Sequence, residues 1–193
     1  MITETARVRL RPAEPDDYLA LHAMEDDPAS LATWRYRGAM PPLEEYEARL
    51  WEQTVAIHLV ESRATGELLG YCQLYDVEPR SGTGWFSVYA APAHRGNGLV
   101  MEGNMVFLEW AFREWPVRWL YAHCLQTNFR AFASTVRRGE CHDLGVMEGR
   151  AILHGEPHDV HVVGFERGLW ESSAVRRRCV AAMERAARDA QSM

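Results

Sequence analysis

One short segment of the chain has residue types and spacing suited to holding an anion. A β-rich run ends at Pro92, and an Arg-Gly-Asn-Gly loop (residues 95–98) then leads into an amphipathic helix. The first turn of a helix has unpaired backbone N–H groups at the positive end of the helix dipole. Gly96 and Gly98 lack the β-carbons that would keep an anion away from these groups, and Arg95 adds a charged donor. We predict that a pyrophosphate binds this loop.

The spacing of the loop excludes two common nucleotide-binding motifs. The chain has no Gly-Lys-Ser or Gly-Lys-Thr sequence, which a nucleoside-triphosphate loop requires. A dinucleotide fingerprint requires a third glycine where Met101 stands. Taken alone, an Arg-Gly-x-Gly sequence is also compatible with a simple glycine turn before a surface helix.

The composition favours a single compact domain. The chain has 193 residues, of which 47% are hydrophobic, enough for a sizeable core. No apolar run is long enough to cross a bilayer and the first residues lack the shape of a signal peptide, so we expect a cytoplasmic protein without a membrane partner. The net charge of −6 argues against nucleic acid as the main partner and is compatible with an amine-bearing substrate.

The cysteines and histidines do not form a recognisable disulfide or metal pattern. The four cysteines lie far apart without a Cys-x-x-Cys pair, which favours a reduced environment. A metal site is an alternative for Asp159 together with His142, His154, His158 and His161. These residues alternate along a predicted hairpin and need not converge, and structural zinc usually recruits sulfur. We therefore expect no metal.

Apolar periodicity and turn residues divide the chain into strands and helices. We predict strands over residues 7–11, 56–61, 68–76, 83–90, 118–125, 147–153 and 159–167. We predict helices over residues 15–24, 41–53, 99–115, 129–138 and 171–190, with an irregular aromatic loop over 27–40. The order β-α-α-β-β-β-α-β-α-β-β-α indicates a mixed α/β fold around one sheet.

This order, with the glycine loop between the fourth strand and the third helix, resembles that of the GNAT acyltransferases. The family's loop pattern, Gln/Arg-x-x-Gly-x-Gly/Ala, aligns with residues 95–100, where Val100 stands in place of the usual glycine or alanine. Further along the same helix, Glu102 and Phe112 resemble a pattern of the Rim-type branch, which includes protein N-terminal and polyamine acetyltransferases.

Two later blocks extend the resemblance to the Rim-type branch. Asn128, Ala131 and Gly139 stand at the spacing of its Asn-x-x-Ala/Ser…Gly segment, although Glu140 replaces an aromatic residue. The segment from Gly149 to Trp170 resembles its final hairpin. The similarity covers residues 7–170, so we expect an acyltransferase domain over residues 1–170 and a helical extension over 171–193 packed on the same domain.

The resemblance implies that acetyl-CoA, or another short acyl-CoA, is the co-substrate and lies in a gap between two neighbouring strands. A free main-chain N–H near Ala90 is then placed to bind the thioester carbonyl oxygen, and Asn128 to bind the pantetheine arm. The cofactor-binding residues implied are Val88, Ala90, Arg95, Gly96, Asn97, Gly98, Leu99, Val100 and Asn128.

The catalytic groups are less sharply defined by the sequence. His123, on the strand beside the expected gap, is a candidate base because a histidine can accept a proton near neutral pH. Tyr89 and Ser87 are alternatives, as are a relayed water molecule and, for His123 itself, a purely structural role. Many family members place a tyrosine that protonates the leaving thiolate where this chain has Thr135; we consider Thr135 and Ser134 for that role.

The aromatic loop and the neighbouring strand are candidates for the acceptor pocket. We predict that Trp34, Tyr36 and Ser87 contact the substrate, although the aromatic residues suit the core equally well. Cys124 is more simply explained as a buried structural residue than as a nucleophile.

The function that the resemblance implies is direct acetyl transfer from acetyl-CoA to a primary amine. The acceptor can be a peptide or protein N-terminus, a polyamine or a small amino metabolite. A non-catalytic coenzyme-A-binding sensor or assembly protein is the alternative, and a dimerisation module is a third hypothesis. The sequence leaves open whether the chain is a monomer or a homodimer.

Overall fold

Seven strands form one sheet in the order β1-β2-β3-β4-β5-β7-β6. This arrangement comes from a computed structural model, which describes residues 3–31, 33–36 and 38–192. The neighbouring strands pair antiparallel except for β4 and β5, which pair parallel. The strands are β1 (Val8–Pro12), β2 (Thr54–Ser62), β3 (Leu68–Glu78), β4 (Thr83–Ala90), β5 (Trp119–Leu125), β6 (His142–Leu153) and β7 (Glu156–Glu166).

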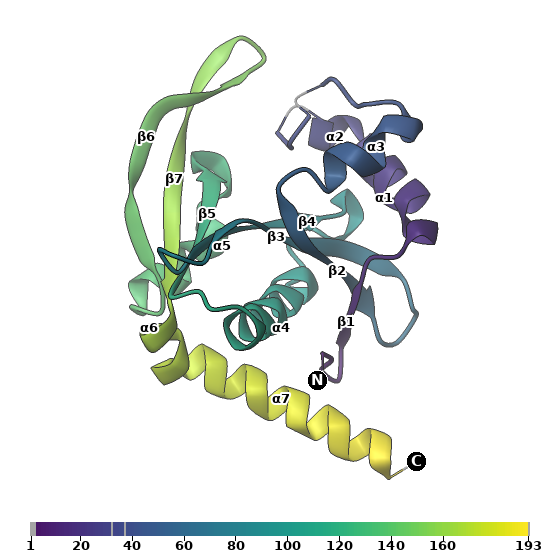
Figure 1. Cartoon of the computed structure of the whole chain (residues 1–193), viewed down its shortest axis with the longest axis vertical. Coiled ribbons are helices and arrows are strands. Elements are labelled where there is room, and N and C mark those ends of the chain that lie inside the picture. The colour runs from purple at the N-terminus through teal and green to yellow at the C-terminus, as the bar shows by residue number, and fades with distance from the viewer. Residues whose placement is uncertain (1–2, 32, 37, 193) are drawn as a thin grey trace.

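Helices cover both faces of the sheet (Figure 1). They are α1 (Tyr18–Glu25), α2 (Pro28–Leu31), α3 (Leu43–Leu50), α4 (Leu99–Glu114), α5 (Arg130–Arg137), α6 (Arg167–Ser172) and α7 (Ala174–Gln191), with the short 3-10 turns η1 (Pro15–Asp17), η2 (Pro92–His94) and η3 (Gln126–Asn128). Figure 1 shows α4 against one face of the strands and α1 to α3 together on the other. The mixed α/β class predicted from the sequence is confirmed.

Most predicted elements are present, and three differ in ways that have a local cause. The aromatic loop contains the short helix α2. The predicted final helix is divided at Ser173, whose backbone is extended (ψ 151°) and whose hydroxyl accepts a hydrogen bond from the Arg176 N–H, so it begins a new helix. Strand β6 begins at His142 rather than at residue 147, because two bulges interrupt the alternation from which a strand is recognised.

The sheet separates two apolar clusters. The larger one lies between the sheet and α4 and includes Phe86, Phe107 and Phe165. The smaller one lies under α1 and α3 and includes Tyr71 and Tyr89. Because successive side chains of a strand point to opposite faces, β4 contributes Phe86 to one cluster and Tyr89 to the other.

Glu109 holds the C-terminal helix against α4. Its carboxylate is 2% exposed and accepts hydrogen bonds from Trp170 Nε1 at 3.0 Å and from Arg176 Nε and Nη2 at 2.8 and 3.0 Å. Glu109→Ala is expected to lower the free energy of unfolding by about 2–3 kcal/mol, because it leaves the three donors of Trp170 and Arg176 without their acceptor. Urea unfolding measures the loss. Glu184→Ala, on the exposed face of α7, is the control, and equal losses in both variants would contradict this role.

His58 makes the fold sensitive to acid. Its ring is 6% exposed and packs 4.2 Å from the Trp110 ring, and burial lowers the pKa of His58 to about 4. As the pH falls from the ordinary histidine pKa toward 4, His58 is therefore protonated in the unfolded chain and still neutral in the folded chain. Over this window the free energy of unfolding is expected to fall by up to about 1.4 kcal/mol per pH unit on account of His58.

Replacing His58 by asparagine should remove that part of the slope. Urea unfolding at a series of pH values between 6.5 and 4 measures it. His154→Asn is the matched control, because His154 is exposed in the hairpin turn with φ +51°, which asparagine tolerates. Identical slopes in the wild type and in His58→Asn would show that His58 does not carry the acid sensitivity.

Candidate active site

The parallel strands β4 and β5 are paired only where they begin. Their register pairs Thr83 with Trp119 and Trp85 with Tyr121, and within the described residues it continues no further. Beyond Trp85, β4 stays paired with β3, whereas β5 stays paired with β7. The two strands consequently diverge, and one edge of β4 is left open over residues 86–90.

The open edge of β4 presents main-chain groups of alternate residues. The Ala91 N–H donates to the Leu69 carbonyl oxygen at 3.0 Å, on the β3 side. In an antiparallel pair the direction of the N–H groups alternates, so those of Val88 and Ala90 face the gap toward β5. The Ala90 carbonyl follows the same alternation and accepts a hydrogen bond from Arg95 Nε at 3.3 Å.

The gap opens into a cavity of about 660 Å³ that reaches the glycine loop and the start of α5. Its walls come from β4, β5, the loop before α4 and the segment after α2. The residues that line it are Ser30, Thr33, Trp34, Phe86, Ser87, Val88, Tyr89, Ala90, His94, Arg95, Gly96, Gly98, Val100, Met101, Ala122, His123, Cys124, Leu125, Asn128, Arg130, Ala131 and Phe132.

The glycine loop has the backbone conformation that only glycine adopts easily. Gly96 and Gly98 have φ of +82° and +80°, and Gly98 is the N-cap of α4. A β-carbon added at either position meets no protein atom within 4 Å, so the space beside the loop is open. The backbone at the N-terminus of α4 is therefore accessible on the side of these glycines, as an anion site requires.

Side chains around the loop hold it in place. The Asn97 carboxamide oxygen accepts a hydrogen bond from the Leu99 N–H at 2.9 Å, and Arg95 Nη2 donates to Ser30 Oγ at 2.6 Å. Val100, at the position where the family usually has glycine or alanine, is 4% exposed and belongs to the larger core cluster. On the opposite wall, Asn128 and Arg130 line the cavity at the start of α5.

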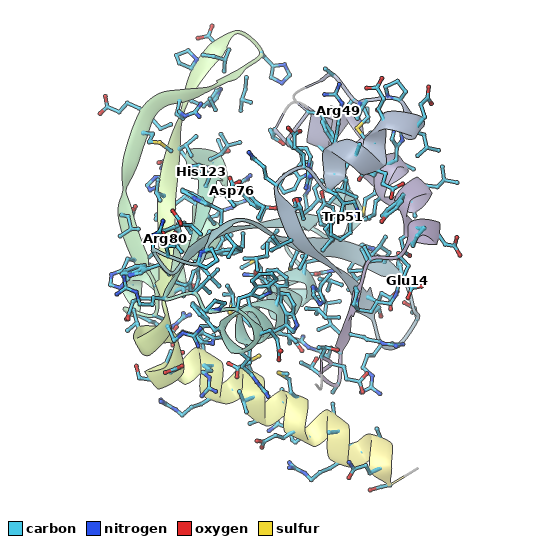
Figure 2. All side chains as sticks on the ribbon, viewed as in Figure 1. Glu14, Arg49, Trp51, Asp76, Arg80 and His123 are labelled. Carbon is cyan, nitrogen blue, oxygen red and sulfur yellow. The ribbon has the colours of Figure 1, made fainter. Side chains whose placement is uncertain are left out.

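His123 lies midway along the cavity, on β5. Its ring centroid is 4.3 Å from that of Trp85, and in Figure 2 it lies between the β6–β7 hairpin and the helices α1 to α3. Partial desolvation, and after it the charge of Arg150, lowers the pKa of His123 below the usual histidine value. The imidazole is therefore neutral near pH 7 and can accept a proton.

Ser87 and Trp34 line the same cavity from the face that bears His123. Ser87 Oγ donates to Gln73 Oε1 at 3.3 Å, and Trp34 Nε1 donates to the Tyr71 hydroxyl oxygen at 3.0 Å. Tyr36, by contrast, is outside the cavity lining, and its ring packs 6.1 Å from the Tyr46 ring.

Comparison with known proteins assigns this arrangement to a family. Residues 7–139 match the family model described as an acetyltransferase (GNAT) domain. The chain belongs to the GNAT acetyltransferase family. The divergent strands and the glycine loop are thus the features of a GNAT acetyltransferase. No curated protein sequence matches the chain.

Solved structures of GNAT enzymes share its fold. The spermidine N-acetyltransferase of Vibrio cholerae, in complex with CoA and spermine, has a TM-score of 0.74 and 18% identity, covering 86% of this chain and 98% of that chain. RimL, a ribosomal L7/L12 α-N-protein acetyltransferase in complex with CoA, has a TM-score of 0.70 and 20% identity, covering 86% and 96%. A GNAT enzyme of Brucella melitensis has a TM-score of 0.69 and 19% identity, covering 93% and 84%. These likenesses agree with the fold that the resemblance implies.

Three residues considered for catalysis have other contacts in this structure, although Tyr89 lines the cavity. The Tyr89 side chain is 2% exposed, its hydroxyl donates to the Met24 carbonyl oxygen at 2.6 Å and lies 2.7 Å from Ser30 Oγ, and burial raises its pKa. Ser134 and Thr135 are outside the cavity lining, and Thr135 Oγ1 accepts a hydrogen bond from Arg138 at 3.5 Å. Tyr89 thus anchors α2 to β4, and the α5 hydroxyls do not reach the cavity.

A buried ionic cluster beside the site was not predicted from the sequence. Glu25 is 1% exposed and accepts hydrogen bonds from the hydroxyls of Tyr46, at 2.8 Å, and Tyr71. Arg35 lies 3.7 Å from the same carboxylate and also donates to the Tyr71 hydroxyl and to Gln73. Glu25 is the last residue of α1, at a position where the sequence pattern predicts an exposed side chain. No local pattern therefore indicates that its carboxylate is buried.

The histidines of the final hairpin have other partners. His161 stacks on Phe129, with ring centroids 3.8 Å apart, and hydrogen-bonds to Asp143 at 3.1 Å and to Gln126. Across the described ranges, no group of three or more His, Cys, Asp and Glu side chains is placed to hold a metal ion. Within the same ranges, none of the helices combines the length and apolar character needed to cross a membrane.

Proposed function

We propose that this GNAT acetyltransferase transfers the acetyl group of acetyl-CoA directly to a primary amine. The observation that supports the proposal is the unpaired edge of β4, which leads at one end to the glycine loop and passes His123 on the facing strand. One cavity thereby offers an anion site, main-chain hydrogen-bond donors and a neutral base.

The anionic end of the co-substrate is assigned to the glycine loop. The N–H groups at the start of α4 donate hydrogen bonds to the pyrophosphate, with Arg95 and Arg130 supplying charge. The amide groups of the pantetheine arm extend the sheet along residues 88–90, and Asn128 binds the arm from the opposite wall. Leu99 and Asn97 complete the first turn; the N–H of Leu99 is satisfied by Asn97 until an anion replaces it.

The thioester is assigned to the divergent part of the gap, near Ala90. The N–H of Val88 or Ala90 polarises the carbonyl oxygen and stabilises the negative charge that develops on it during attack. Loss of one such donor typically lowers kcat by about 100-fold to 1,000-fold.

His123 is assigned the role of general base. It accepts a proton from the acceptor ammonium group, directly or through one water molecule, and the free amine attacks the carbonyl carbon. The nitrogen of the tetrahedral intermediate loses a second proton to solvent water, the carbon–sulfur bond breaks to give an amide and the CoA thiolate, and the proton held by His123 passes to the thiolate sulfur. This transfer is needed because neither Ser134 nor Thr135 lines the cavity.

Release of the CoA thiol tests the proposal. Acetyl-CoA is incubated with the protein alone and with a panel of primary amines, and the free thiol is titrated. We expect release that depends on an added amine. A rise in melting temperature with acetyl-CoA but no amine-dependent release would favour the alternative, a coenzyme-A-binding sensor, which the position of Ser134 and Thr135 outside the cavity lining allows.

A further inference from the structure

We propose that the acceptor of this enzyme carries an anionic group, such as a carboxylate, in addition to its amine, and that Arg150 binds that group. The inference rests on the proposed function and names the class of its acceptor. It is carried by a second cavity, by a bulge in β6 and by the distribution of charge along the cleft.

A second cavity of about 150 Å³ adjoins the first one on the side away from the glycine loop. The two cavities share Thr33, His123 and Leu125, so a molecule in the second cavity lies next to the proposed base. Four of its eight lining residues are apolar side chains of the β6–β7 hairpin. The residues that line it are Thr33, His123, Leu125, Met147, Arg150, Ala151, Leu153 and Val160.

A bulge in β6 brings Arg150 into this cavity. Met147 pairs with Val160 and Ala151 with His158, so three residues of β6 stand opposite the single residue Asp159. Gly149 takes the left-handed conformation, with φ +59°, and donates its N–H to Asp159 Oδ1 at 2.8 Å. A bulge of this kind turns a side chain away from the regular alternation, and here Arg150 becomes part of the cavity wall.

Arg150 has no carboxylate partner of its own. Within the described parts of the chain no Asp or Glu oxygen lies within 4.0 Å of its guanidinium. Asp159, opposite the bulge, already accepts the Gly149 N–H. Arg35, by contrast, is paired with buried Glu25. Arg150 therefore remains free to bind an anion from outside the chain.

The charge of the whole cleft supports an anionic acceptor. The ionisable side chains that line the two cavities, tyrosine and cysteine aside, are His94, Arg95, Arg130, His123 and Arg150, and no carboxylate is present among the lining residues described. The chain as a whole has a net charge of −6, so this concentration of cations is local. Arg95 and Arg130 stand near the proposed pyrophosphate site, which leaves Arg150 without a role in binding CoA.

A polyamine fits this charge distribution poorly. After its reacting amine has lost a proton, a polyamine retains at least one ammonium group, which would lie beside Arg150 with no carboxylate to balance it. The one fully buried carboxylate nearby, Glu25, is already hydrogen-bonded to two tyrosines and paired with Arg35. An amine with a carboxylate and an apolar stem matches Arg150 and the apolar walls instead.

Three amines of the same chain length test the proposal: 5-aminopentanoate, pentylamine and 1,5-diaminopentane. We expect kcat/KM to be highest for the aminopentanoate, by about 10-fold to 100-fold over the diamine, as a charge-assisted hydrogen bond implies. Arg150→Glu should invert the order of the anionic and the cationic amine. Arg188→Glu, the same charge reversal at the far end of α7, is the control and should leave the order unchanged.

Binding of pentanoate, which has no amine, to the protein–CoA complex provides a readout without turnover. Saturation-transfer NMR should detect pentanoate with the wild type and not with Arg150→Glu. Pentanoate binding without turnover of any amine would support the anion site while contradicting the proposed function. Amine-dependent thiol release with equal kcat/KM for the three amines, and no pentanoate binding, would overturn this inference and leave the proposed function intact.

Discussion

Replacing Gly98 by tryptophan is expected to raise the Kd for acetyl-CoA by about 100-fold, equivalent to about 2.7 kcal/mol. Gly98 is the N-cap of α4, and the backbone N–H groups next to it are the proposed ligands of the pyrophosphate. A β-carbon at this position meets no protein atom within 4 Å. The indole would therefore extend into the space assigned to the phosphates without a steric clash at its β-carbon. Isothermal titration calorimetry measures the change.

A matched variant separates loss of the anion site from backbone strain. Gly139 also has a positive φ, of +65°, and open space around an added β-carbon, but it is outside the cavity lining. Gly139→Trp is therefore expected to carry a similar strain and to bind acetyl-CoA like the wild type. Thermal unfolding confirms that both variants fold. Wild-type affinity in a folded Gly98→Trp variant would refute the assignment of the loop to the pyrophosphate.

Replacing His123 by glutamine is expected to lower kcat by about 100-fold or more, because general base catalysis contributes roughly that factor. The Kd for acetyl-CoA should stay close to that of the wild type, since the proposed CoA ligands lie on the glycine loop and the edge of β4. Steady-state kinetics with a saturating amine, together with calorimetry, separates the two quantities. His154→Asn, in the exposed hairpin turn, is the control. A His123→Gln variant with wild-type kcat would assign the proton transfer to water.

The pH dependence provides a second test of His123. Burial and the charge of Arg150 lower its pKa, so the acid limb of kcat/KM should lie below the ordinary histidine pKa. Lower pH protonates the imidazole and removes the base. In Arg150→Gln the charge that lowers the pKa is absent, and the limb should move to higher pH. An acid limb that stays in place would indicate that another group titrates.

The glycine loop and β4 were predictable because their signals are local. Positive φ at Gly96 and Gly98 is a property of glycine itself, and β4 was predicted with its observed bounds, residues 83–90, because turn residues delimit it on both sides. The cavity beside them follows from the divergence of β4 and β5, which depends on pairings between residues far apart in the chain and has no local signature.

The role of individual polar side chains was harder to predict. Tyr89 and Ser87 alternate with Val88 and lie on the same face of β4, yet only the Tyr89 hydroxyl hydrogen-bonds to α2. The aromatic sequence of residues 27–40 does not predict that helix. Arg150 reaches the acceptor end only because a bulge shifts the alternation of β6. Such placements depend on tertiary contacts, which a single sequence does not display.

A single-turnover experiment tests the central claim most directly. The protein is mixed with an equal amount of acetyl-CoA labelled in its acetyl group, without amine and then with 5-aminopentanoate, pentylamine or 1,5-diaminopentane, and the masses of protein and amine are followed. The chain contains no lysine, so the background from acetylation of its own side chains is small. Direct transfer predicts that the label passes to the amine while the protein mass never changes. Label that stays on CoA with every amine tested, or that first appears on the protein, would contradict the account.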